Sequence, residues 1–479
     1  MIAALLVAGL AAGFGVWSGE NLRWALITAM IAVTLLPLIV RALQGKFDPF
    51  EPIVVFAVGI AVIFVARPIT ELADGIQVYA GYFTRPGFNG AMTIALVGTA
   101  SLYAGYALPV GRRWAERTRT PSIRWDVGLS VRFGVRLLAL GAVLYLLHAV
   151  TAGGGITQSL KFFIGRGATS GNVLQSSSGW LYLGPYLTLP ASMLFLSAWQ
   201  RTRSPRTLAL FVFALLLGLL ITVPRGDRTY VLALLLPLSI LRPLRRGRRP
   251  RFLVIVVGVF VAVIAINFLQ IYRNVGTRAD ASQKLTEVIT KPLSPIHDLL
   301  AGPDVSFFSV LELQHEVQPR ETPFHPGVTP LSILAGPIPS IFWKAKPLSG
   351  AVPVAVYLFY QQSLVSKASN DPAMFGDFYA DYGFFTLILY SVLLGIALRA
   401  MYLYLRRNER LPGAQLALAS SMPLMIILLR GALEDTIARS VVLLVPLLVA
   451  WWVCSRPRGQ RIPRLRSGGL AYRRRRSNI

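Results

Sequence analysis

The sequence predicts an all-α membrane protein: a bundle of about twelve spanning helices with one long external loop between the ninth and tenth spans. Composition is the first observation behind this prediction. Of the 479 residues, 54% are hydrophobic and only 14% are charged, whereas soluble domains carry roughly 25% charged residues. The second observation is that apolar residues form repeated continuous runs of about 17–20 residues, which favours helices over the alternating strands of a β-barrel.

The expected spans are the apolar runs at residues 2–17, 24–42, 51–66, 90–110, 128–151, 180–198, 207–223, 229–241, 252–270, 382–404, 413–429 and 438–454. The first run has no basic segment before it, so we interpret it as a span and not as a cleavable signal peptide. The single cysteine, Cys454, excludes a disulfide framework and a cysteine-based metal site. Four parts follow: N-terminal spans (1–270), an extracytoplasmic loop with short helices (271–381), C-terminal spans (382–454) and a basic tail (455–479).

The net charge of +27 is distributed unevenly along the chain. With the N-terminus inside, almost all of it falls on the inner connectors and the tail, including the arginine-rich segments 242–251 and 473–476. This positive-inside bias predicts that both termini are cytoplasmic. Basic runs beside spans are explained by topology and by anionic lipid, so nucleic-acid binding is not expected.

The long segment 271–381 is the expected site of function. It contains three of the four histidines and ten of the 21 acidic residues, and connections of this length in compact proteins usually bind, gate or catalyse. Short helices are expected at 281–289 and 305–316, followed by a stretch of rigid, irregular backbone that is rich in proline and aromatic residues. Near its end, Asp377 and Asp381 are four residues apart and share one face of a helix. Two interpretations stay open for this pair: capping of the following span, or catalysis.

Arginines occur at several external turns, close to carboxylates. The arginines are Arg225, Arg228, Arg273, Arg278, Arg430 and Arg439, and the carboxylates are Asp227, Asp377, Asp381, Glu434 and Asp435. A guanidinium group is planar and permanently charged and therefore suits phosphate; the alternative is an Arg–Asp pair solvated at the membrane surface. We expect these side chains to converge on one pocket, roofed by the loop, for a polyanionic lipid-linked ligand. No Walker motif, GxGxxG, HExxH or CxxC occurs, which disfavours nucleotide-driven chemistry and structural zinc.

Three short motifs carry a resemblance to a known family. They are Gly226-Asp227-Arg228 at the start of the span 229–241, the run from Gly336 to Pro347, and the run from Phe375 to Gly383. In these motifs and in its hydropathy layout, the chain resembles the bacterial O-antigen and exopolysaccharide repeat-unit polymerases (Wzy-type), which belong with the multi-span lipid-dependent glycosyltransferases. It departs from their pattern in two places: Ser340 stands where the family has arginine, and Asp377 stands where it has glutamate.

The resemblance implies an enzyme of cell-envelope polysaccharide biosynthesis. The reaction it implies is transfer of a glycan from polyprenyl diphosphate to a lipid-linked repeat unit at the external face, with a chain-length regulator as a further partner. No cofactor is expected, and a metal is not needed because fixed guanidinium groups can supply the neutralising charge. Asp377 would then be the general base, and Arg228 and Arg273 would stabilise charge on the departing diphosphate. The substrate-binding residues would be Arg225, Arg278, Trp343, Lys344, Lys346, Asp381, Arg430 and Glu434.

Three alternatives stay open. An O-antigen-ligase-like transferase would move the glycan to a different acceptor. A transporter or flippase for an amphipathic anion is expected to show internal repeats and helices broken at mid-membrane, and the sequence shows no repeat. A non-catalytic scaffold protein is the third alternative, but this function would not explain the arginines at the external turns.

Overall fold

The computed structural model describes residues 19–45, 47–79, 82–118, 123–151, 184–222, 228–247, 297, 300–302, 305–335, 338, 343, 347, 372–431 and 433–457. Within these residues the chain is mostly helical, and the strands form two short antiparallel ladders. The all-α class predicted from the sequence is confirmed. The predicted spans at 2–17 and 252–270 lie outside the described residues, so the count of about twelve spans stays a prediction.

Five helical segments in the described part of the chain are long and apolar enough to cross a membrane. They are α2 (Glu20–Leu43), the continuous segment α3–η1–α4 (Pro52–Ala61, Val62–Ala66 and Arg67–Ala73), α7 (Val127–Thr151), α20 (Ala373–Arg407) and α21 (Pro412–Leu429). A sixth span is formed by α5 (Phe88–Ala107) and α6 (Pro109–Arg117) if this pair, bent by 45°, is counted as one. The bend lies at Leu108, whose backbone is extended because a proline follows it.

Shorter elements complete the described structure. The helices of the bundle are α11 (Thr188–Thr202), α12 (Pro205–Thr222), α13 (Arg228–Arg245), α22 (Leu433–Leu443) and α23 (Val445–Cys454), with the single turns η2 (Arg85–Gly87) and η3 (Gly184–Leu187). The loop contributes α17 (Phe307–Val317) and α18 (Val328–Ala335). The strands are β1 (Val78–Tyr79), paired with β2 (Tyr82–Phe83), and β3 (Ile123–Trp125), paired with β4 (Ser455–Pro457).

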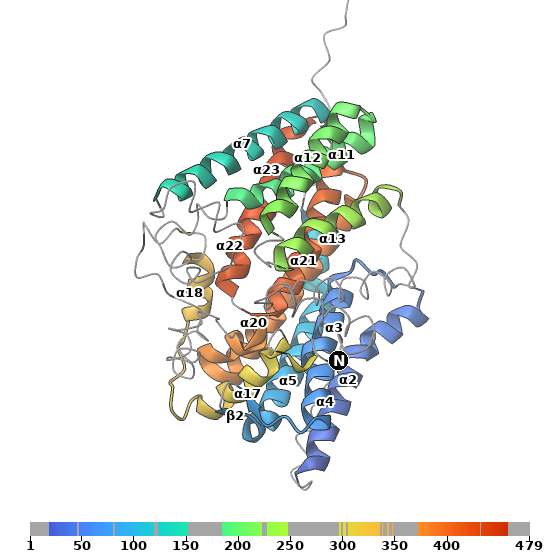
Figure 1. Cartoon of the computed structure of the whole chain (residues 1–479). Helices are drawn as coiled ribbons and strands as arrows, with labels where there is room; N and C mark the ends of the chain where they lie inside the picture. Colours follow the sequence, from blue (N-terminus) through green and yellow to red (C-terminus); the bar gives the residue numbers. More distant parts are fainter. Residues whose placement is uncertain are drawn as a thin grey trace, which may run out of the picture.

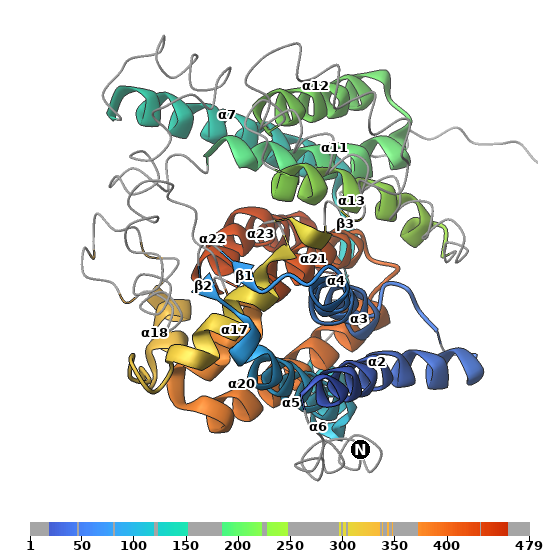
Figure 2. The same cartoon turned by 60° about the horizontal axis from the view of Figure 1, so that its bottom comes forward.

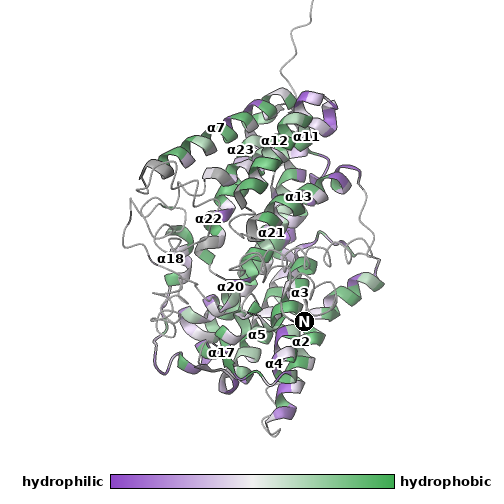
Figure 3. Ribbon diagram, viewed as in Figure 1, coloured by the Kyte–Doolittle hydropathy of each residue, from purple (hydrophilic) through white to green (hydrophobic). Residues whose placement is uncertain are grey.

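The helices form three adjacent groups (Figure 2). α7, α11, α12 and α13 make one side, α21, α22 and α23 lie in the middle, and α2 to α6 with α20 make the other side; α5 packs along α20, and α13 packs along α21. α21 is the central helix, because 89% of its apolar window is buried. By contrast, α2 and α7 bury only 28% and 22% of theirs. Many of their apolar side chains are exposed, and both ribbons are largely coloured as hydrophobic in Figure 3, as expected of helices that face lipid.

The bundle has two chemically different ends. At the first, which we call the loop end, α17 and α18 lie against the start of α20 (Figure 1), and α18 also contacts α22. At the second, which we call the basic end, β3 pairs with β4 and so joins the start of α7 to the end of α23. The charge pattern assigns the connector before α7 and the segment after α23 to the same membrane face, and in the structure these two segments lie together. Which end faces the cytoplasm stays a prediction.

Two buried carboxylates hold the basic end together. Glu51 accepts hydrogen bonds from the hydroxyl of Tyr106 (2.7 Å) and from Arg399 (2.9 Å). Asp48 accepts one from the hydroxyl of Tyr402 (2.7 Å). These contacts connect the turn between α2 and α3 to the last turns of α5 and α20.

α5 and α20 cross in backbone contact at two glycines. A Cβ on Gly105 would lie 2.2 Å from the backbone oxygen of Val392, and a Cβ on Gly395 would lie 2.2 Å from the backbone oxygen of Leu102. Small residues at helix crossings let backbones approach closely in membrane proteins. The crossing therefore has no room for a larger side chain at either glycine.

We expect Gly105→Ala and Gly395→Ala each to lower the thermal unfolding midpoint of the detergent-solubilised protein. The added methyl group meets backbone, and overpacking of this kind costs about 1–3 kcal/mol. The matched control is Gly128→Ala in the first turn of α7, where the nearest atom to the new methyl group lies 3.5 Å away. This change should leave the midpoint unchanged or raise it, because alanine favours helix. Equal midpoints for the three variants would show that the crossing is not tight.

Candidate functional site

Helix α17 brings the loop into the bundle. The sequence predicts an amphipathic helix at 305–316, and the structure has the helix at Phe307–Val317 but buries most of its side chains. A Cβ on Gly87 would lie 2.1 Å from the backbone oxygen of Glu312, so the η2 turn touches α17 directly. α17 is therefore an inner helix, and the loop is part of the packed structure.

Arg67 forms a buried ion pair within α4 and ties the loop to this helix through hydrogen bonds. Its side chain is 1% exposed and donates to Glu71 (2.7 Å), to the backbone oxygen of Leu300 (2.5 Å) and to the hydroxyl of Ser309 (3.1 Å). Ser309 in turn donates to Glu71 (2.5 Å). The π-helical turn Val62–Ala66 lies directly before Arg67, and such irregular turns occur frequently at functional sites. Because a buried charge is tolerated only with partners of this kind, the pair fixes the position of the loop.

The Gly-Asp-Phe-Tyr-Ala-Asp motif forms the start of α20, and the helix breaks directly after it. Tyr382 (φ −155°, ψ 45°) and Gly383 (φ 62°, ψ −140°) are non-helical, and the positive φ of Gly383 is one that residues with side chains rarely adopt. The hydroxyl of Thr386 bridges the break, since it donates to the backbone oxygen of Phe378 (2.7 Å) and accepts from the backbone N–H of Tyr382 (2.9 Å). Residues Ala373–Asp381, which we call the motif helix, are thus separate from the spanning part of α20.

Two buried glutamines hold the motif helix against α17. Gln314 donates to the backbone oxygen of Gly376 (3.0 Å), and Gln318 donates to that of Ala380 (3.2 Å). A Cβ on Gly376 would lie 2.5 Å from the side-chain oxygen of Gln314, so this approach requires glycine. Sequence reasoning missed both glutamines, because a glutamine on a short helix belongs to no motif.

Asp381 ties α18 to α20. Its side chain is completely buried, and its two oxygens accept hydrogen bonds from the backbone N–H of Thr329 (2.9 Å) and from the hydroxyl of Tyr390 (2.9 Å). The hydroxyl of Thr329 also donates to the backbone oxygen of Asp377 (3.1 Å). In this structure Asp381 therefore positions α18, and its assignment to substrate binding stays a prediction.

Asp377 lies at the N-terminus of a different helix, α22. Its side chain is 1% exposed, and one carboxylate oxygen accepts a hydrogen bond from the backbone N–H of Leu433 (3.3 Å), the first residue of α22. The partial positive charge of a helix N-terminus stabilises a carboxylate at this place. The described contact thus supports a capping role of Asp377 at α22. The catalytic interpretation stays a prediction.

Arg430 belongs to the same cluster. It follows α21 directly, and its guanidinium group lies 5.2 Å from the ring centroid of Phe307, the first residue of α17. The turn that carries Arg430 leads within three residues to Leu433, which contacts Asp377. We call the motif helix, the start of α17 and this turn the loop-end cluster.

Comparison with known proteins adds no family to this geometry. No protein-family model, no curated protein and no solved structure matches the chain. The function is therefore inferred from the residues of the loop-end cluster and from the sequence motifs.

The other predicted site residues are placed only in part. Arg228 is the first residue of α13 and Glu434 the second of α22, but their side chains lie outside the description. Trp343 is 37% exposed. Outside the described residues lie Arg225, Arg273, Arg278, Lys344 and Lys346. The convergence of the external arginines on one pocket thus stays a prediction.

Three buried polar atoms near the motif helix have no hydrogen-bond partner among the described residues. They are the side-chain oxygen of Gln314, Nδ1 of His315 and Nε2 of His325. Buried polar groups are normally paired, so these three atoms are exceptions within the described residues. Within the same described ranges, no three His, Cys, Asp or Glu side chains form a metal-binding group.

Glu312 on α17 is a buried acid beside the Arg67–Glu71 pair. Its side chain is 1% exposed, and its Oε2 has no hydrogen-bond partner among the described residues. Burial raises the pKa of Glu312 well above its usual value, and the negative charge of Glu71 raises it further; Thr84, Arg67 and Arg23 oppose this shift. The neutral form of Glu312 is therefore favoured in the folded protein.

This shift predicts a specific pH dependence of stability. Because the folded pKa lies above the unfolded value, the contribution of Glu312 is fully present below the unfolded pKa and is lost as the pH rises through the folded pKa. We expect the thermal midpoint of the wild type to fall as the pH rises above the unfolded pKa of a glutamate, about 4.3, and that of Glu312→Gln to fall less. Glu316→Gln, a change on the same helix but nearer to solvent, should follow the wild type. Parallel curves for wild type and Glu312→Gln would refute this assignment.

Proposed function

We propose that the chain is a membrane-embedded glycosyltransferase that polymerises lipid-linked oligosaccharide repeat units. The observation that carries this proposal is the buried carboxylate of Asp377, held at the N-terminus of α22 in the same cluster as Arg430. Transfer from a lipid diphosphate needs a base for the acceptor hydroxyl and fixed positive charge for the leaving group. The motif resemblance supports the same reaction.

In the proposed reaction, a hydroxyl group of one lipid-linked unit attacks the anomeric carbon of another glycan. A new carbon–oxygen bond forms, and the bond between the anomeric carbon and the diphosphate oxygen breaks. Asp377 takes the hydroxyl proton, while Arg430, together with Arg228 and Arg273, stabilises the negative charge on the departing polyprenyl diphosphate. Asp381 acts by holding α18 beside the motif helix.

The proposal places the loop end at the outer face of the bacterial plasma membrane and both termini in the cytoplasm. The excess of arginine and lysine at the basic end supports this orientation. The partners are then polyprenyl-diphosphate-linked oligosaccharide, membrane lipids and a chain-length regulator. A ligase-like transferase would use the same groups with a different acceptor.

Deletion of the gene in the native host tests this function. We expect single lipid-linked repeat units to accumulate on the outer leaflet, and long chains to return when the wild-type chain is expressed again. A ligase-like transferase would instead leave long chains on the lipid carrier, and a flippase would leave single units on the inner leaflet. Either of these results would rule out the polymerase.

A further inference from the structure

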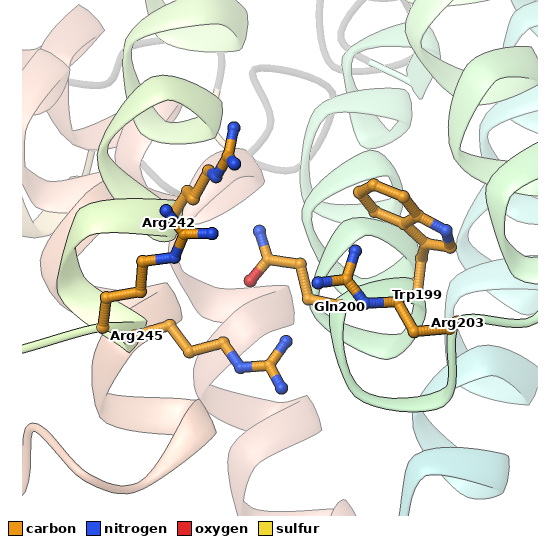
Figure 4. Close-up of a pocket in the computed structure, with 6 residues that line it drawn as sticks. Trp199, Gln200, Arg203, Arg242 and Arg245 are labelled. Atoms are coloured by element: carbon orange, nitrogen blue, oxygen red, sulfur yellow. The ribbon is translucent and has the colours of Figure 1, made fainter.

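A cavity of about 320 Å³ opens between the C-terminal ends of α11 and α13 (Figure 4). We call it the arginine pocket; its lining residues are Trp199, Gln200, Arg203, Arg242, Arg245 and Arg246. Figure 4 shows Arg203 and Arg245 extending toward Gln200 from opposite sides. None of the lining residues is acidic.

The arginine pocket lies at the basic end of the bundle. α11 runs antiparallel to α7, because Gly134 faces Phe195 and Gly141 faces Leu187. The end of α11 therefore lies beside the start of α7, where β3 pairs with β4. A ligand in this pocket is thus remote from the loop-end cluster.

Four guanidinium groups from the described part of the chain line this space. Among the described residues, none of Arg203, Arg242, Arg245 and Arg246 forms an ion pair. Arg203 has a left-handed backbone (φ 54°) and lies over the ring of Trp199 at 5.1 Å. Like charges around one cavity repel each other, so this arrangement is stabilised by an anion.

Helix polarity and topology do not account for the pocket. Arginines near helix C-termini interact favourably with the helix dipole, and basic connectors orient spans. Both effects need only solvated charges at the surface. Neither requires a cavity that also contains Trp199 and the buried side chain of Gln200, which is 9% exposed.

The charge and size of the pocket fit a phosphate-bearing ligand. Guanidinium groups bind phosphate oxygens through paired hydrogen bonds, and the amide of Gln200 adds a donor. The volume corresponds to about ten water molecules at roughly 30 Å³ each. This is more than a single phosphate fills, and it suits a diphosphate or a phosphodiester with its attached glycerol.

The neighbouring helix α12 provides an apolar surface beside the pocket. α12 begins at Pro205, two residues after Arg203. Its exposed apolar side chains are Leu208, Val212, Phe213, Leu216 and Leu220. At this spacing they form one stripe along the helix, which gives the acyl chain of a lipid bound in the pocket a surface to lie on.

We propose that the arginine pocket binds a phosphate-bearing anion, either the headgroup of an anionic membrane lipid or a free diphosphate. The proposal does not rest on the polymerase activity, since the pocket and the loop-end cluster lie at opposite ends of the bundle. It assigns a specific binding role to arginines of the segment 242–251. From the sequence alone, these arginines are explained by membrane topology and by general attraction to anionic lipid.

The test uses the purified full-length chain in two settings. In phosphatidylcholine nanodiscs with and without phosphatidylglycerol, native mass spectrometry measures retained phosphatidylglycerol; in detergent, the thermal midpoint is measured against inorganic diphosphate. Retention identifies the lipid and a raised midpoint identifies the free anion. The double variant Arg242→Gln with Arg245→Gln should weaken the observed binding about tenfold or more. The double variant Arg242→Lys with Arg245→Lys keeps the positive charge of the pocket but loses the planar guanidinium groups. We therefore expect it to lose less binding than the glutamine variant.

The control is Arg112→Gln with Arg113→Gln on α6, which removes the same charge from exposed positions at the basic end. It should bind as the wild type does. Equal losses in the control and the Arg242/Arg245 glutamine variant would reduce the pocket to general surface charge and overturn the proposal. Absence of binding by the wild type, or wild-type binding by the glutamine variant, would overturn it as well. The lysine variant keeps the charge of the pocket. If it retains part of the binding, the loss in the glutamine variant comes from the missing guanidinium groups and not from misfolding.

Discussion

Asp377→Asn should slow chain extension by about 10²–10⁴-fold, because asparagine cannot accept the proton of the attacking hydroxyl. The substitution keeps the size of the side chain and an oxygen that can accept the hydrogen bond from Leu433, now 3.3 Å long. The start of α22 therefore stays capped and the variant should fold. Measured with lipid-linked repeat units, the turnover number should fall while the apparent affinity for the lipid substrate changes little.

The matched control for this experiment is Asp74→Asn. Asp74 is an exposed carboxylate that pairs with His297 of the loop at 2.9 Å, so the change removes an equal charge without touching the motif helix. Its turnover should equal that of the wild type. If Asp377→Asn lost binding and turnover together, Asp377 would be a structural cap of α22 and not a general base.

Arg67→Gln should have the largest effect on stability. The side chain of Arg67 is 1% exposed and contacts Glu71, Leu300 and Ser309. Removing the cation leaves the carboxylate of Glu71 buried without its partner, and loss of one member of a buried pair costs about 3–5 kcal/mol. We expect the variant to unfold at a much lower temperature in detergent, or to yield little folded protein.

The chain offers a close control for this prediction. Arg112 and Glu116 form a pair with the same i,i+4 spacing and the same distance of 2.7 Å, but their side chains are 71% and 58% exposed. Arg112→Gln should leave the midpoint unchanged, because exposed pairs contribute little. Adding Glu71→Gln to Arg67→Gln should recover part of the lost stability, since no unpaired charge then remains. Similar midpoints for Arg67→Gln and Arg112→Gln would mean that the buried pair does not anchor the loop.

Local sequence patterns were sufficient for α17 and for the break in α20. They were wrong for α18, because the proline-rich stretch that contains it was expected to be irregular. The break at Tyr382 and Gly383 lies where the polar motif meets the apolar run 382–404, because a glycine next to a polar motif marks a local change of backbone. The helix expected at 305–316 is α17. Such features depend on neighbours within a few residues, which a sequence shows directly.

Contacts between segments that are far apart in the chain could not be predicted from the sequence. Arg67 and Ser309 are 242 residues apart, and an arginine at the end of an apolar run has the same local pattern whether it is buried or faces headgroups. The spacing of Asp377 and Asp381 predicted a shared helix face, but it did not show that Asp377 meets α22. In the same way, the sequence shows the basic segment 242–251 and not the cavity between it and α11.

The most direct test of polymerase activity is a reaction with purified components. The chain is reconstituted in nanodiscs with polyprenyl-diphosphate-linked repeat units isolated from cells that lack the gene, and the products are measured by mass spectrometry. We expect chains of two and more repeat units, with polyprenyl diphosphate released in an amount equal to the new glycosidic bonds. Repeat units that bind to the folded protein but stay single would contradict the proposed function.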